Sequence, residues 1–138
     1  MTRFNVFFDN NCPPSMARTL EAFLNDERRR VVHLKDVLPP NASDVDWIGY
    51  VSREAGDWIV VTRDRRVLTR SAERVALQSA RLRLLAMSAG LLKLQHHEQM
   101  ARLIQQWPRV EAAMALVAPP AGYRLPPRWN GQLEQLAV

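Results

Sequence analysis

Residues 7–16 read FFDNNCPPSM, and the change of character within this stretch decides how the first part of the chain folds. The apolar run Phe4–Phe8 has the length of a short buried strand and ends abruptly at Asp9. Pro13 and Pro14 then favour the start of a helix, because the first helical turn tolerates proline. The stretch therefore predicts a strand, an acidic turn and a helix in immediate succession.

Strand-like and helix-like segments alternate along the rest of the chain. We expect strands at 4–8, 31–34, 58–62 and 82–87 and helices at 15–24, 43–55, 71–79 and from about 96, with residue 108 kinking that last helix or starting another that continues over 110–117. Strands that alternate with helices predict an α/β fold with a mostly parallel, doubly wound sheet.

The length and composition bound the class of protein. A chain of 138 residues with 47% hydrophobic residues suits a single domain with one core, which we place at 1–117 with a proline-rich tail at 118–138 that wraps the surface. No apolar run approaches the roughly 18 residues that span a bilayer, and the N-terminus lacks the layout of a signal peptide. A single cysteine suits a reducing compartment, so we expect a cytoplasmic protein without membrane contact.

The charge balance is basic, with 19 Lys and Arg against 14 Asp and Glu. All but two of the basic residues, Lys35 and Lys93, are arginines. The planar guanidinium meets phosphate oxygens in pairs, so this excess suits a nucleic-acid partner. A GC-rich coding sequence, which favours Arg over Lys, explains the same composition.

Four acids stand where a parallel sheet brings residues together. Asp9 follows the first strand, Asp64 follows the strand 58–62, and Asp44 and Asp46 begin the helix that leads into that strand. Ligands collect at the carboxyl ends of parallel strands, so these acids can converge on one edge. Like charges about 4 Å apart repel by roughly 4 kcal/mol at an effective dielectric near 20, which calls for a cation. Mg²⁺ or Mn²⁺ suits such oxygen ligands and can activate water and neutralise a phosphodiester.

Each acid also has a purely local interpretation. Asp9 can form a turn before the prolines, and Asp64 can start the turn that follows its strand. Asp46 stands three residues after Ser43 and can complete a capping box, while Asp44 in the first helical turn is favoured by the helix dipole. Four arginines near Asp64 form either a phosphate-binding group or a solvated basic face: Arg63, Arg65, Arg66 and Arg70.

Four stretches, in order over nearly the whole chain, carry a resemblance to a known family: FFDNNCPPSMARTLEAF, VVHLKDVLPPNASDVDWI, WIVVTRDRRVLTRSAERVAL and EQMARLIQQWPRV. The chain resembles PIN-like domains related to VapC toxins, in the branch with a short FDNN-x-PP opening. The resemblance implies a PIN-like three-layer α/β sandwich, with a mostly parallel central sheet of four or five strands flanked by helices.

The resemblance also implies an activity and roles for residues. Asp9 becomes the first-strand acid, Asp64 the acid after the central strand, and Asp44, with or without Asp46, the middle acid. Glu73 occupies the position of a fourth acid, and Asn10 either orients Asp9 and metal-bound water or forms a turn. The expected function is a metal-dependent ribonuclease using Mg²⁺ or Mn²⁺, held by an antitoxin protein and able to form a homodimer.

Two other functions remain open. One is a PIN-like module without catalytic activity that binds RNA or a protein. The other is a phosphoacceptor receiver domain, which the amides after Asp9 and the position of Lys93 disfavour.

Overall fold

The structure is a computed structural model that describes residues 3–64, 66 and 68–138. Its helices and strands, in chain order, are β1 (Asn5–Phe8), α1 (Pro14–Leu24), β2 (Val31–His33), α2 (Leu34–Val37), α3 (Asp44–Arg53), β3 (Trp58–Thr62), α4 (Ser71–Ala80), β4 (Arg83–Met87), α5 (Ala89–Leu92), α6 (His96–Ala115), β5 (Ala121–Leu125) and β6 (Glu134–Leu136).

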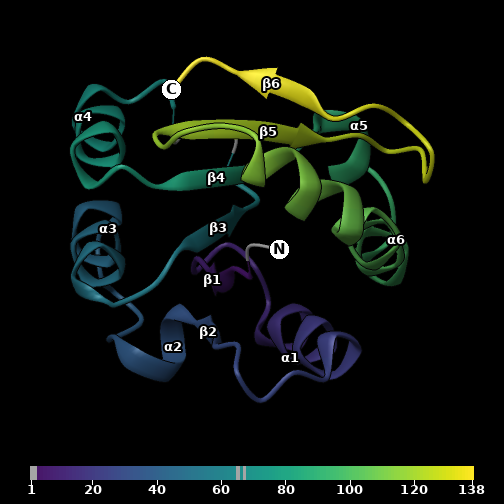
Figure 1. Ribbon diagram of the computed structural model, residues 1–138, viewed down its shortest axis with the longest axis horizontal. Coiled ribbons are helices and arrows are strands. Elements are labelled where there is room, and N and C mark those ends of the chain that lie inside the picture. The colour runs from purple at the N-terminus through teal and green to yellow at the C-terminus, as the bar shows by residue number, and fades with distance from the viewer. Residues whose placement is uncertain (1–2, 65, 67) are drawn as a thin grey trace.

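The strands form one six-stranded sheet in the order β2-β1-β3-β4-β5-β6. The pairs from β2 to β5 are parallel, and β6 pairs antiparallel with β5. Helices α1, α5 and α6 cover one face of the sheet and α2, α3 and α4 cover the other (Figure 1). The predicted three-layer α/β sandwich is therefore confirmed, with six strands where four or five were expected.

Alternating side chains of the buried strands supply the two cores. Phe8, Val61 and Leu85 face the helices α1 and α6, whereas Phe7 and Val60 face α3 and α4. Both faces are covered, so the strands read as continuous apolar runs, as parallel strands do. This is why Phe4–Phe8 and Trp58–Thr62 were recognisable in the sequence.

The C-terminal tail does not wrap the surface as predicted. Its residues Ala121–Leu125 form β5, which extends the sheet beside β4, and Leu125 is completely buried. The sequence AGYRL has neither a long apolar run nor strict alternation. Its strand conformation comes from pairing with β4, which a local pattern does not reveal.

Two predicted boundaries also change. The second strand ends at His33, and Leu34 begins α2 because His33 and Asp36 form a capping box there. Helix α6 continues through Pro108 and does not restart. Leu103, Trp107 and Val110 are buried along it, and at about 1.5–3 kcal/mol each their burial offsets the roughly 3 kcal/mol that an interior proline costs.

In the part of the chain that the structure describes, none of the helices combines the length and apolar composition that a membrane-spanning segment requires.

Candidate acidic site at the switch point of the sheet

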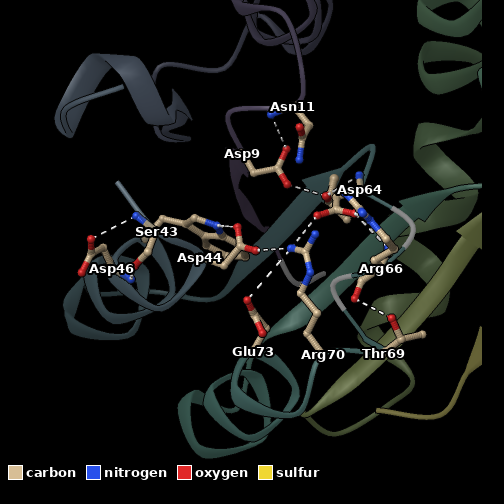
Figure 2. Close-up of polar contacts among 12 residues, drawn as sticks. Asp9, Asn11, Ser43, Asp44, Asp46, Asp64, Arg66, Thr69, Arg70 and Glu73 are labelled. Atoms are coloured by element: carbon tan, nitrogen blue, oxygen red, sulfur yellow. Dashed lines mark hydrogen bonds and ion pairs between the residues drawn. The ribbon is translucent and has the colours of Figure 1, made fainter. Parts of the chain in front are cut away.

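The candidate site lies where the strand order reverses. From β1 the chain passes to β2 on one side and then to β3 on the other, so the crevice opens between β1 and β3. Doubly wound sheets bind their ligands outside the carboxyl ends of the strands at this point. Asp9 directly follows β1, Thr62 ends β3, and Asp64 comes two residues later. Figure 2 shows the side chains of Asp9, Asp44 and Asp64 converging there.

Asp9 is a buried carboxylic acid, only 1% exposed. One carboxylate oxygen accepts a hydrogen bond from the hydroxyl of Thr62, and the other accepts one from the backbone N–H of Asn11 at 3.1 Å. Burial opposes the charged form and raises the pKa of Asp9 from 3.8 to about 6. The two hydrogen bonds act against this rise, and the negative charge of Asp44 adds to it.

Thr62 connects the two strand-end acids through one hydroxyl group. The hydroxyl donates to Asp9 and accepts the backbone N–H of Asp64 at 3.0 Å. Thr62 itself is fully buried. The turn that carries Asp64 is thus fixed relative to the carboxylate of the neighbouring strand.

Arg70 joins the other two acids. Its Nη1 atom lies 3.1 Å from Oδ2 of Asp44 and 3.1 Å from Oδ2 of Asp64. The indole N–H of Trp47 donates to Oδ1 of Asp44 at 2.9 Å, which orients that carboxylate toward the site. Glu73 is further away, with Oε1 4.0 Å from the same nitrogen of Arg70. The guanidinium therefore supplies the positive charge that these acids require.

Asp46 is the one predicted site acid that the structure directs elsewhere. Its side chain accepts the backbone N–H of Ser43 at 3.0 Å, and its own N–H donates to the Ser43 hydroxyl at 3.1 Å. Figure 2 shows this capping box on the side of α3 away from Asp9. The capping interpretation of Asp46 is the one that matches its contacts.

The remaining predicted residues fall into different positions. Asn10 is exposed and donates to the backbone oxygen of Pro40 at 3.3 Å. Arg66 is exposed, and its Nε atom lies 3.7 Å from Oδ1 of Asp64. Arg70, predicted to hold phosphate, is instead paired with the acids. Arg65 lies outside the described residues.

A pocket of about 500 Å³ opens beside Asp64, lined by Asn11, Arg63, Asp64, Arg66 and Leu92. Arg63 donates through Nη1 to the backbone oxygen of Asn11 at 3.4 Å. Its Nε atom is buried and has no partner among the described residues. Two arginines and one acid thus share a pocket that is open to an anionic ligand.

The loop after β1 is fixed by a hydrogen bond to the buried side chain of His33. Nδ1 of His33 accepts the N–H of Lys35 at 3.0 Å, so the proton lies on Nε2, which donates to the backbone oxygen of Cys12 at 2.6 Å. Burial, with the charge of Asp9, raises the pKa of the Cys12 thiol well above its usual value. Cys12 is therefore an unreactive core thiol.

The donor set suits a hard divalent cation in its chemistry, since carboxylate oxygens are the ligands that Mg²⁺ and Mn²⁺ prefer. Over residues 3–64, 66 and 68–138, no three acidic, histidine or cysteine side chains are gathered closely enough to form a ready-made metal site. Between Asp44 and Asp64, Nη1 of Arg70 lies where a shared cation would lie. These acids are of the kind that holds such a cation, and in this structure the positive group in contact with Asp44 and Asp64 is the guanidinium of Arg70.

The fold and site together define a doubly wound α/β domain with an acidic centre at its switch point. Residues 4–89 match the family described as PIN-like domain, and the chain belongs to this family. The match runs from the first strand to just beyond β4, so it includes Asp9, Asp44, Asp64 and Arg70. No curated protein and no solved structure matches the chain.

Sequence reasoning missed two residues that build the site. Thr62 was assigned only to a strand, although a polar residue closing the apolar run WIVV just before an acid is a recognisable signal. Asn11 donates its backbone N–H to Asp9, which is the turn that the sequence offers for Asp9, and it also lines the pocket. Its place at the pocket has no signature in the sequence.

Proposed function

We propose that this protein is a metal-dependent ribonuclease of the PIN-like type. One observation carries the proposal: Asp9, Asp44 and Asp64 come from three separate segments and converge at the switch point, beside a pocket that carries Arg63 and Arg66. Acids and arginines side by side suit a site for a phosphodiester. RNA is the substrate that the family membership and the basic composition favour.

In this proposal each residue has a defined task. Asp9, Asp44 and Asp64 hold Mg²⁺ or Mn²⁺, which when bound supplies activation of water and neutralisation of phosphate charge. Thr62 and the N–H of Asn11 keep the Asp9 carboxylate oriented.

Substrate binding falls to the basic side of the pocket. Arg63 and Arg66, with Arg65 from the same stretch, contact the phosphates on either side of the cleaved bond. Arginine is suited to this task because its guanidinium meets two phosphate oxygens at once. Asp46 takes no part in the reaction.

The toxin of a toxin–antitoxin pair is the biological role that we propose for this activity. It is supported by the resemblance to VapC-related domains in the stretches around Asp9 and Asp64. The partner is then an antitoxin protein that covers the acidic centre.

A second candidate function is a PIN-like module that binds RNA or a protein without cutting. The pairing of Arg70 with Asp44 and Asp64 favours it, because one positive charge already offsets part of the negative charge of the two acids without a metal. Under this alternative, chelators leave RNA binding unchanged.

Single-stranded RNA should be cut by the purified protein with Mn²⁺ and left intact with EDTA. Asp64→Asn is expected to lower the cleavage rate at least ~100-fold, because a metal ligand is lost. Asp57→Asn is the matched control. Asp57 directly precedes β3, at the amino end of the strand whose carboxyl end leads to Asp64, and its side chain is 62% exposed. Cleavage by Asp64→Asn at the wild-type rate would contradict the proposal, and EDTA-insensitive RNA binding without cleavage would support the binding module.

A further inference from the structure

Arg70 contacts the acidic centre in an unusual way for an arginine. A guanidinium normally meets one carboxylate with two parallel N–H groups. Here a single nitrogen, Nη1, lies 3.1 Å from Asp44 and 3.1 Å from Asp64 (Figure 2). One nitrogen shared by two carboxylates has the geometry of a point-like cation between two ligands.

The exposure of the three side chains differs between the two acids and Arg70. The side chains of Asp64 and Asp44 are 10% and 20% exposed, and each accepts a further hydrogen bond that fixes its orientation. The side chain of Arg70 is long and 37% exposed, and it extends from the residue that directly precedes α4. The carboxylates are therefore held in place, while the guanidinium can leave into water.

We propose that Arg70 is the resident cation of the acidic centre and competes with the divalent metal for Asp44 and Asp64. The inference rests on the proposed function and deepens it, because it assigns regulation of metal occupancy to a residue of the same chain. At low metal concentration Arg70 offsets part of the negative charge of the two acids. Metal binding displaces its guanidinium, which is then free to contact a phosphate of the substrate.

A structural role for Arg70 gives the opposite prediction. If the arginine only held the two acids together, its removal would let them separate and metal affinity would fall. If Arg70 competes, its removal leaves two fixed, unneutralised carboxylates and metal affinity rises. The sign of the change in affinity distinguishes the two roles.

The test is a calorimetric titration of the full chain with Mn²⁺ alone, without RNA. Arg70→Gln is expected to bind Mn²⁺ about 10-fold more tightly than the wild type, which lies within the roughly 5- to 150-fold range of typical coupling between binding equilibria. Arg74→Gln is the matched control, because Arg74 is exposed one turn further along α4 and its loss changes the net charge equally. That control should bind Mn²⁺ as the wild type does.

A second variant keeps the test decisive if Arg70→Gln does not fold. Arg70→Met also removes the positive charge and keeps a flexible, unbranched side chain, so it should likewise bind Mn²⁺ more tightly than the wild type. An affinity for Mn²⁺ in Arg70→Met that is no tighter than that of the wild type overturns the competition.

The outcomes separate this inference from the proposed function. If the wild type binds Mn²⁺, Asp64→Asn does not, and Arg70→Gln binds equally or more weakly, the competition is overturned and the metal site stands. If neither the wild type nor Arg70→Gln binds Mn²⁺, the metal site and the competition are both overturned. Tighter binding by Arg70→Gln, absent from Arg74→Gln, supports both.

Discussion

The carboxyl group of Asp9 is buried, with two hydrogen bonds and no cation in direct contact among the described residues. Its pKa of about 6 means that the folded protein holds this carboxylate at a free-energy cost near neutral pH. The rise from 3.8 corresponds to roughly 3 kcal/mol. Such an unfavourable charge is common at functional sites, where a ligand relieves it.

Replacing Asp9 with Asn should stabilise the protein at pH 7.5 and have little effect at pH 4. Between pH 4 and 6 folded Asp9 keeps a proton that the unfolded chain has released, so its contribution to stability falls as the pH rises through this window. Above pH 6 the free energy of unfolding of Asp9→Asn should exceed that of the wild type by up to roughly 3 kcal/mol. Urea denaturation from pH 4 to pH 8 measures the free energy of unfolding of the wild type and of Asp9→Asn. A difference between the two that stays constant over this range would contradict the raised pKa of Asp9.

The sequence indicated which acids can lie near one another but not their partners. Asp9 and Asp64 follow strands whose ends a parallel sheet places together, and Asp44 and Asp46 begin the helix that leads into the second of these strands, although only Asp44 turns toward the other two. Arg70 was assigned to phosphate because the sequence shows its charge without showing which way the side chain turns. In the structure it pairs with Asp44, 26 positions away along the chain.

At the scale of elements, the first turn of α3 gives two neighbouring acids different partners. Asp44 points to Arg70 and the site, whereas Asp46 completes the capping box with Ser43. Two positions apart on a helix, their side chains lie on different faces. The proximity of these acids in sequence therefore does not make them one ligand group.

Asp46→Ala should cost about 1 kcal/mol of stability and leave both the Mn²⁺ response and any RNA cleavage unchanged, since only the helix cap is lost. Asp44→Asn should instead weaken the Mn²⁺ response while the cap stays intact. Thermal melts with and without Mn²⁺ compare the two variants directly. Equal loss of the metal response in both would place Asp46 in the site after all.

The elements that were predicted correctly are those with a local signal. Helix α3 begins after Ser43 as its capping box indicates, and the buried strand Trp58–Thr62 matches its apolar run. Strand β5 had no such signal, because its pairing with β4 connects residues about 38 positions apart in register, as Arg83 with Ala121. Tertiary pairing decided that element.

At the scale of the whole molecule, the last residues of the chain complete the sheet. Met114, in α6, and Leu125, in β5, belong to the same core as Phe8. Gln106 and Arg102 of α6 donate hydrogen bonds to the backbone of residues 127–131, which lead from β5 to β6. The segment 118–138 is therefore part of the folded domain and not an appendage to a core at 1–117.

Truncation after residue 117 should abolish cooperative unfolding, because it uncovers the edge of β4 and removes the buried side chain of Leu125. Truncation after residue 132 removes β6 together with Leu133 and Val138, which pack partly buried against the two cores, and should leave a folded but less stable protein. Urea denaturation followed by circular dichroism distinguishes the two. A chain ending at 117 that unfolds as cooperatively as the full chain would show that β5 is dispensable.

The two outer strands of the sheet have a consequence for how copies of the protein can meet. Each outer strand, β2 and β6, is only three residues long, and β6 carries Glu134 in an ion pair with Arg124 of its neighbour at 3.1 Å. Short edge strands are poor templates for joining one sheet to another, and the charge on β6 adds to this effect at its end of the sheet. Polymerisation by continuous sheet extension is disfavoured at both ends, so self-association is left to the helical layers.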